Sequence, residues 1–296
     1  MANSSSATGT GSGARTYCSE QNPEEPLWGT ADTVDVWLCL EYRPAWKARA
    51  LTDNALAAPT RQWLEQTVAA LAGIGLKARP QFVRQPRIDR EDVRLLVTSA
   101  GRTARFSGRG YDFLLDLDLP AQLGGGTDFG AGGEMVVEPQ YLVCTNGQRD
   151  LCCARYGLPI YTELAERVGE RAWQVTHLGG HRFAANVLTL PDACLYGRIT
   201  PETLSDFVSK VEAGEPDFPH LRGRTCYPPI VQAAEAALGR QEVRLLHVDG
   251  DEDAGTVVFA DAHQRWTVPI RRAESAMKVM KSCGDEAELV HPFVRG

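Results

Sequence analysis

Hydrophobic side chains in the first half of the chain switch between the spacing of strands and the spacing of a helix. Apolar residues recur at every second position over 34–40, as in a half-buried strand. Residues 60–72 carry an apolar face at helical spacing, with Pro59 before the helix and Gly73 after it. Further apolar runs predict strands at 81–84, 93–97 and 113–119. We therefore expect a mixed α/β unit over 25–122.

The second half resumes these patterns after a glycine-rich stretch at 123–138, which we interpret as a linker. A strand is predicted at 141–143, then a helix, then a second strand at 171–176. Paired strands and a capped helix follow at 183–190, 193–199 and from Thr200 onward. We expect a second α/β unit over 139–240 with a βαββα core, and a β-rich extension packed on it at 241–296. We see no convincing internal sequence repeat.

Composition narrows the classes of protein that fit. A chain of 296 residues with 43% hydrophobic residues is long enough for two domains. The net charge is −7 and no basic stripe is present, so we expect no nucleic-acid partner. The first residues are rich in Ser, Gly and Thr and resemble no signal peptide, which predicts a disordered tail over 1–24. No apolar run approaches the roughly 18 residues of a membrane span, so we expect a soluble, cytoplasmic protein.

Cysteine and histidine carry the candidate chemistry. The eight cysteines lack the regular spacing of a disulfide scaffold, which favours reduced thiols and metal ligation. Cys144, Cys153, His177 and His181 fall within one short window, and this pairing of thiolate with imidazole is typical of zinc and iron-sulfur centres. The five cysteines that stand alone are predicted to be small buried hydrophobes: Cys18, Cys39, Cys194, Cys226 and Cys283.

The residues alone leave three kinds of site open: a structural zinc site, a two-iron centre and the site of a thiol oxidoreductase. A zinc protease is disfavoured because Leu178 stands where the catalytic glutamate would be, and Gly179 with Gly180 favours a tight loop in which backbone N–H groups can approach a metal centre. A structural Cys2His2 zinc site suits the ligand types. Eight residues between the two cysteines, however, exceed the usual two to four of a zinc knuckle and favour a larger, two-iron centre. A thiol oxidoreductase using Cys152 with Cys153 is the third kind, weakened because adjacent cysteines form a strained ring.

The spacing and the residues around it resemble the sucrase/ferredoxin-like family, whose C-terminal part is a thioredoxin-like ferredoxin domain. Its pattern of two cysteines separated by eight residues and a later His-x-Gly-Gly-His fits 144–153 and 177–181. The resemblance covers most of the chain, continuing at 147–150, 182–183, 196–198, 200–201, 222–224, 232–235 and more faintly 25–31. It implies a thioredoxin-like ferredoxin domain at 139–240. Residues 25–122 could then be a degenerate thioredoxin-like unit.

The resemblance also implies a cofactor and its ligands. It implies a 2Fe-2S cluster with Cys144 and Cys153 on one iron and His177 and His181 on the other. Cys152, next to Cys153, is the alternative second thiolate, because sequence does not fix the register of a loop. Zinc remains the alternative metal.

A 2Fe-2S cluster with two histidine ligands implies electron transfer at a raised potential. Two neutral imidazoles in place of two thiolates make the centre less negative, so its potential should lie above the roughly −400 mV of plant-type ferredoxins. The potential should also fall as pH rises, since a ligating histidine keeps one ring N–H. We therefore expect a one-electron carrier that works with a redox partner, for which a flavoprotein reductase is a candidate, and that has no independent catalysis. No carboxylate pair is placed for glycoside chemistry, so we expect no sucrose hydrolysis.

Arginines near the motif have two interpretations. Arg149, Arg182 and Arg198 most simply support the fold or face solvent. They could instead donate hydrogen bonds around the centre, as Gly179 and Gly180 could, or dock an electron-transfer partner.

Overall fold

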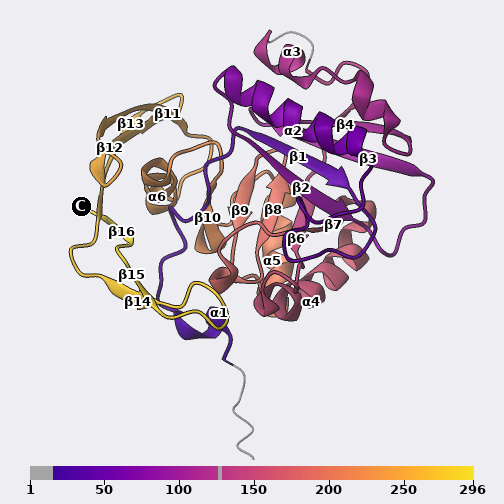
Figure 1. The fold of residues 1–296 in the computed structure, drawn as a ribbon. Coiled ribbons are helices and arrows are strands. Elements are labelled where there is room, and N and C mark those ends of the chain that lie inside the picture. Colours follow the sequence, from indigo (N-terminus) through magenta and orange to yellow (C-terminus); the bar gives the residue numbers. More distant parts are fainter. Residues whose placement is uncertain (1–15, 126–128) are drawn as a thin grey trace, which may run out of the picture.

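A ten-stranded mixed sheet runs through the protein in the computed structural model, which describes residues 16–125 and 129–296 (Figure 1). Its strands lie in the order β10-β9-β8-β6-β7-β2-β1-β3-β4-β5. Their bounds are β1 Val36–Glu41, β2 Ala78–Arg84, β3 Asp92–Ser99, β4 Arg102–Arg109, β5 Glu134–Val136, β6 Gln140–Cys144, β7 Ala172–Val175, β8 Val187–Leu190, β9 Cys194–Tyr196 and β10 Leu221–Arg224.

The same strand order occurs twice in this sheet. In the first half β1 is parallel to β2 and antiparallel to β3, which is antiparallel to β4. In the second half β6 is parallel to β7 and antiparallel to β8, which is antiparallel to β9. The halves meet where β2 and β7 pair antiparallel, with Val83 opposite Val175. The topology therefore repeats about the β2–β7 junction, although we see no convincing repeat in the sequence.

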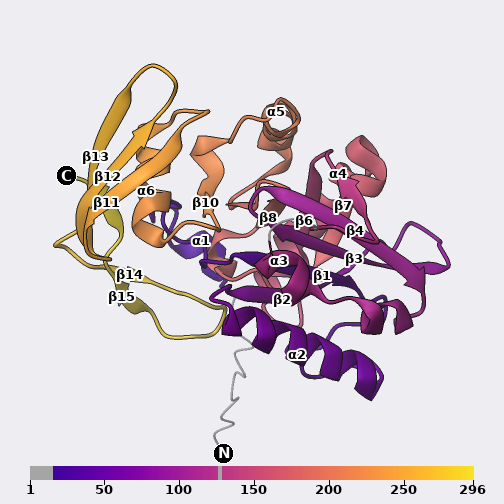
Figure 2. The same ribbon diagram turned by 90° about the horizontal axis from the view of Figure 1, so that it is seen from above.

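Helices cover the outer faces of the two halves and lie on opposite sides of the molecule (Figures 1 and 2). Helix α2 packs on the first half, whereas α4 and α5 pack on the second. The inner faces share one core, in which Trp37 and Leu96 of the first half lie with Leu142 and Trp173 of the second. The α-helices are α1 Cys18–Gln21, α2 Ala58–Gly73, α3 Leu119–Gly124, α4 Leu151–Val168, α5 Pro201–Glu212 and α6 Pro229–Leu238, and the 3-10 helices are η1 Asp112–Asp116, η2 Gly169–Arg171, η3 His181–Phe183 and η4 Phe218–His220.

The predicted mixed α/β class is confirmed, and the sheet curls on itself. The units expected at 25–122 and 139–240 contribute to one sheet and one core, because the inner face of the first half carries no helix of its own and is buried against the second half. Their separation into two domains stays a prediction.

Three local expectations differ from the structure. Residues 113–119, predicted as a strand, lie in η1 and the start of α3, since the apolar run makes a tight turn that buries Leu114 and leaves Leu115 exposed. The linker expected at 123–138 contains β5, which pairs with β4 at the sheet edge. Of the tail expected at 1–24, residues 1–15 lie outside the described residues, but α1 is helical because Cys18 is buried against the rest of the protein.

The C-terminal part forms a four-stranded sheet in the order β11-β12-β13-β16 and a small β14-β15 pair. Val257 and Phe259 of the larger sheet pack against Ile230 and Val231 of α6. The connection between β14 and β15 returns to α1 (Figure 1). Across residues 16–125 and 129–296, helices fall short of the length and apolarity that a membrane crossing needs. The strands are β11 Arg244–Gly250, β12 Ala254–Ala260, β13 Arg265–Arg272, β14 Met277–Val279, β15 Glu288–Val290 and β16 Phe293–Arg295.

Candidate metal centre

Two buried cysteines face each other where β6 meets α4. Cys144 is the last residue of β6, and Cys153 lies in the first turn of α4. Their Sγ atoms are 3.4 Å apart. The helix can approach the strand this closely because Gly157 has no side chain, and a Cβ there would stand 2.1 Å from the carbonyl oxygen of Cys144. The two thiols are thus placed by one strand end and one helix start.

The two histidines lie on a loop that turns back over the cysteines. His177 follows β7, and His181 begins η3. Gly179 and Gly180 between them have φ angles of 90° and 68°, a left-handed conformation that glycine adopts without strain. The imidazole rings stack with centroids 4.1 Å apart. The sequence expectation of a tight loop here agrees with this geometry.

The four side chains converge on one place. The ligand atoms of Cys144, Cys153 and His177 all lie within 4.8 Å of one another, and His181 Nδ1 is 3.8 Å from Cys153 Sγ. Two thiolates on one tetrahedral ion with bonds of about 2.3 Å would be about 3.8 Å apart, close to the spacing here. His177 Nδ1 is buried and has no hydrogen-bond partner in the protein. Since buried polar atoms are normally paired, this nitrogen is suited to a metal, and the set could hold one.

The local environment shifts the pKa values of three of these side chains. The hydrogen bond between Cys144 and Cys153 lowers the pKa of Cys144 well below its usual value, aided by His177. The same hydrogen bond raises the pKa of Cys153. Burial lowers the pKa of His181 to about 4, and the nearby His177 adds to the effect. The hydrogen bond therefore favours the thiolate of Cys144 over that of Cys153, and burial favours the neutral imidazole of His181.

A buried arginine from β10 holds the histidine loop in place. Arg222 is only 2% exposed, and its guanidinium donates to the carbonyl oxygen of Gly179 at 2.8 Å and to Asn186 Oδ1 at 2.8 Å. It also donates to the carbonyl oxygen of Thr30 at 2.6 Å. A Cβ on Gly180 would stand 2.5 Å from this guanidinium. Sequence reasoning missed the role of Arg222, which no local pattern distinguishes from an exposed arginine.

The three arginines singled out in the sequence lie around the loop with different partners. Arg182 forms a two-point ion pair with buried Glu25, at 2.7 and 2.8 Å. Arg198 donates to the carbonyl oxygen of Asn22 at 2.7 Å, so both arginines attach the N-terminal segment to this region. Arg149 is exposed beside His177. The contacts of Arg182 and Arg198 are those of fold-supporting residues.

Cys152 does not join this group. Its Sγ atom lies 3.5 Å from that of Cys18 and 3.3 Å from that of Cys283, in a separate cluster beside Asp150. Cys18 is buried as expected and Cys283 is only partly buried, but the expectation of small hydrophobes does not include the contact between them, which the fold makes over a large sequence separation. The expectation of burial is confirmed for Cys39 and Cys194 and is wrong for Cys226, which is exposed.

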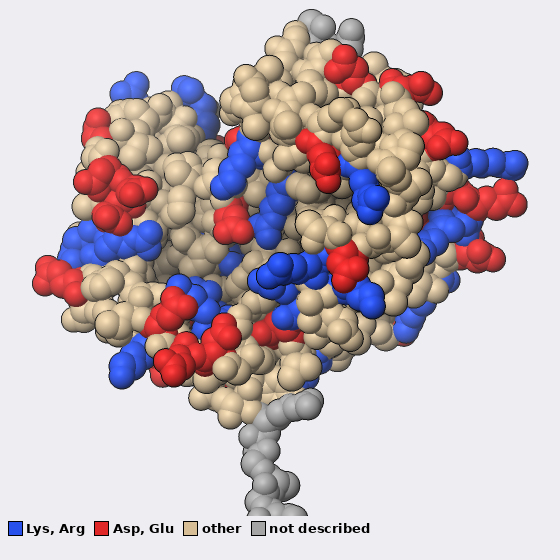
Figure 3. Space-filling view, in the orientation of Figure 1, with Lys and Arg blue, Asp and Glu red and all other residues tan. Residues whose placement is uncertain are grey.

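His177 also reaches the protein surface. It lines an open pocket of about 490 Å³ between the strand ends and the 48–52 segment. The residues that line this opening include Arg49, Arg79 and Arg149, of which Arg79 forms an ion pair with Asp32 at 2.6 Å. The face drawn in Figure 3 mixes both signs of charge, with basic side chains gathered toward its middle. The net charge of the chain thus does not describe the surroundings of His177.

Fold and site together define a mixed α/β protein with a Cys2His2 group, buried except at His177, that could hold a metal. A model of the sucrase/ferredoxin-like family matches residues 27–223, and the chain belongs to this family. The chain is also similar to altered inheritance of mitochondria protein 32 of Meyerozyma guilliermondii, with 29% identity over 83 residues. That match spans 25% of this chain and 29% of the relative's length. No solved structure matches the chain.

Proposed function

We propose that Cys144, Cys153, His177 and His181 hold a 2Fe-2S cluster and that the protein transfers single electrons. The observation that carries the proposal is the convergence of these four side chains, with His177 Nδ1 buried and unpaired. The membership in the sucrase/ferredoxin-like family supports it. When bound, such a cluster supplies one-electron redox chemistry.

Two irons are preferred to one zinc ion because the chain belongs to the sucrase/ferredoxin-like family and because eight residues separate the two cysteines. The two sulfurs are neighbours at 3.4 Å, and the two imidazoles are neighbours with ring centroids 4.1 Å apart. Cys153 Sγ also lies 3.8 Å from His181 Nδ1, so the distances by themselves do not separate the cysteines from the histidines. A structural zinc module stays the second candidate, because the same residue types suit a tetrahedral zinc ion. A thiol oxidoreductase using Cys152 with Cys153 has less support, since the two sulfurs belong to different clusters.

The proposal extends to the two halves of the ten-stranded sheet. We propose that β6 to α5 form a thioredoxin-like ferredoxin domain and that β1 to β4 with α2 form a degenerate copy of it. The repeated strand order on either side of the β2–β7 junction supports this assignment. The second copy carries the four ligands, whereas the first contributes Arg79 and Gln81, which both donate to the carbonyl oxygen of His177 at 3.2 Å.

The opening beside His177 is the place where an electron would enter or leave. His177 is half-buried and is the ligand that lines this pocket, so a partner docked there would approach the histidine-bound iron. Arg49 and Arg149 around the opening favour an acidic surface on that partner, whereas the charge of Arg79 is paired with Asp32. We propose a redox protein, with a flavoprotein reductase as a candidate. The eight free cysteines support a reducing compartment such as the cytoplasm.

Metal content and visible spectrum test the proposal. Protein purified without oxygen is expected to contain two irons and two sulfides per chain, to be coloured, and to bleach and become paramagnetic on reduction. A colourless protein with one zinc ion bound by two sulfurs and two nitrogens would favour the structural zinc module instead.

The reduction potential is expected to fall as pH rises. Ferric iron makes the ring N–H of a ligating histidine more acidic than ferrous iron does, so the oxidised state loses that proton first. His177→Cys should keep the cluster but lower its potential, because a thiolate replaces a neutral imidazole, and should weaken the pH dependence. Protein-film voltammetry between pH 6 and 10 measures both quantities. A potential that is flat with pH in the parent protein would contradict histidine ligation through a protonated ring.

A further inference from the structure

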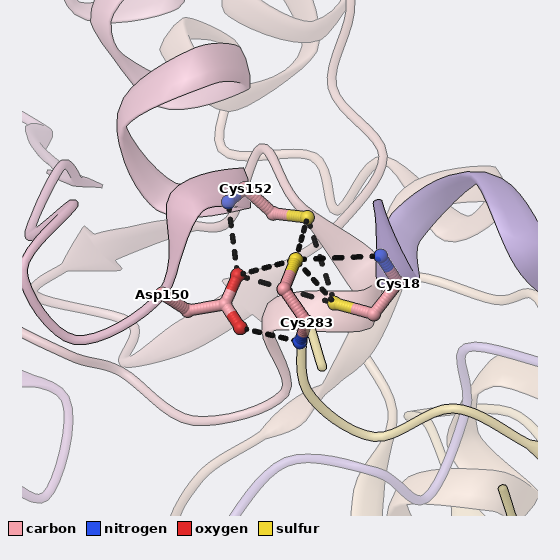
Figure 4. A group of neighbouring side chains, drawn as sticks. All are labelled: Cys18, Asp150, Cys152 and Cys283. Carbon is pink, nitrogen blue, oxygen red and sulfur yellow. Dashed lines mark hydrogen bonds between the residues drawn. The ribbon is translucent and has the colours of Figure 1, made fainter. Parts of the chain in front are cut away.

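Three cysteines and one carboxylate from separate parts of the chain form a second cluster beside the first. Cys18 comes from α1, Asp150 and Cys152 from the start of α4, and Cys283 from the connection between β14 and β15 (Figure 4). Their ligand atoms all lie within 4.8 Å of one another. Neither the family resemblance nor the proposed electron transfer assigns them a role.

The sulfur positions suit a common centre better than a disulfide. The three Sγ···Sγ distances are 3.5 Å from Cys18 to Cys152, 3.3 Å from Cys152 to Cys283 and 3.7 Å from Cys18 to Cys283. Sulfurs on one tetrahedral ion with bonds of about 2.3 Å stand about 3.8 Å apart, whereas a disulfide needs about 2.05 Å. A disulfide would also use only two of the three thiols.

The carboxylate completes the set and is held in position by the backbone. Asp150 Oδ1 lies 3.3 Å from Cys283 Sγ and 4.0 Å from Cys18 Sγ. The backbone N–H of Cys152 donates to Oδ1 and that of Cys283 donates to Oδ2, each at 2.9 Å. Because each oxygen has two lone pairs, Oδ1 retains acceptor capacity toward a cation.

Hydrogen-bond donors around the sulfurs are placed to stabilise thiolates. The hydroxyl of Ser19 donates to Cys152 Sγ at 3.3 Å, and the backbone N–H of Cys18 donates to Cys283 Sγ at 3.5 Å. Donors of this kind commonly surround metal-bound sulfur. Cys18 and Cys152 are buried and Cys283 is partly exposed, so an ion could reach the site from the side of Cys283.

We propose that Cys18, Cys152, Cys283 and Asp150 form a tetrahedral zinc site. Three sulfurs and one oxygen suit a borderline-soft ion that prefers four ligands, and binding releases the thiol protons. The ion would attach α1 and the β14–β15 connection to the start of α4, the helix that also carries Cys153. The site is distinct from the Cys2His2 group, because Cys152 and Cys153 point to different clusters.

Metal analysis of purified protein and matched variants tests the site. The parent protein is expected to hold one zinc ion per chain in addition to any iron. Cys18→Ser and Cys283→Ser should each lose this zinc and leave the iron content and visible spectrum unchanged. Cys226→Ser, which changes an exposed cysteine outside both clusters, should keep both metals. Zinc retained in Cys18→Ser and Cys283→Ser, or parent protein without zinc, would overturn the proposal.

X-ray absorption at the zinc edge tests the site without any substitution. The expected shell has three sulfurs at about 2.3 Å and one oxygen at about 2.0 Å. A shell of two sulfurs and two nitrogens would place zinc at the Cys2His2 group, which would overturn both this site and the proposed iron cluster. Peptide mapping under non-reducing conditions tests whether two of these cysteines form a disulfide instead. A Cys152–Cys283 or Cys18–Cys152 disulfide in zinc-free protein would also overturn the proposal.

Discussion

Cys144→Ala is expected to remove the iron and the visible colour from the protein completely. Cys144 is 1% exposed and its Sγ lies 3.4 Å from that of Cys153, so no solvent-derived ligand can readily take its place. The thiol of Cys152, which is adjacent in sequence to Cys153, belongs to the cluster with Cys18 and Cys283 and is not placed to substitute. Without Cys144, the iron held by the two cysteines keeps only one protein thiolate, and the 2Fe-2S centre is lost.

Cys194→Ala is the matched control for this substitution. Cys194 is also 1% exposed and lies on β9 of the same sheet, but its Sγ belongs to neither cluster. The two substitutions remove the same atom from similarly buried positions, so general destabilisation should be comparable. Iron and sulfide analysis with visible spectroscopy reports the outcome. Full iron content in Cys144→Ala, or an equal loss in Cys194→Ala, would show that Cys144 is not a ligand.

Arg222→Met is expected to lower the free energy of unfolding by about 2–4 kcal/mol, because it leaves several buried acceptors unpaired. Arg222 is 2% exposed and donates to Thr30, Gly179 and Asn186. The methionine fills much of the same space but donates no hydrogen bond. The histidine loop should lose its attachment to the N-terminal segment, and hydrogen exchange should increase at 177–181.

Arg109→Met provides the comparison for a surface arginine. Arg109 is 89% exposed and pairs with exposed Glu91, so its loss should change the unfolding free energy by at most about 0.5 kcal/mol. Urea denaturation followed by circular dichroism measures both variants against the parent protein. Equal midpoints for Arg222→Met and Arg109→Met would refute the structural role assigned to Arg222.

Local patterns in the sequence predict the elements that carry the ligands. The spacing of apolar residues indicates α4 and α5, and the two glycines between His177 and His181 indicate a tight loop, as the structure has it. The apolar pattern does not predict β4 or β10. Their sequences, Arg102–Arg109 and Leu221–Arg224, carry arginines in place of a clear apolar alternation.

Long-range features could not be predicted in the same way. Cys18 and Cys283 are 265 residues apart in sequence, and nothing near either residue indicates that the fold brings them together. The shared core between the two halves of the sheet could not be predicted either. A strand buried on both faces shows an apolar run whether its second face is covered by a helix or by the other half of the sheet. Arg222 is inconspicuous for the same reason, since burial of a charged side chain depends on contacts made far along the chain.

Pulsed electron paramagnetic resonance of the reduced protein, with and without 15N-labelled histidine, tests the central claim most directly. Ligation by two cysteines and two histidines predicts a signal of a reduced 2Fe-2S centre with two strongly coupled nitrogens that respond to the label. A 2Fe-2S signal without strongly coupled histidine nitrogen, or no paramagnetic centre in protein that carries zinc at these four side chains, would contradict the account.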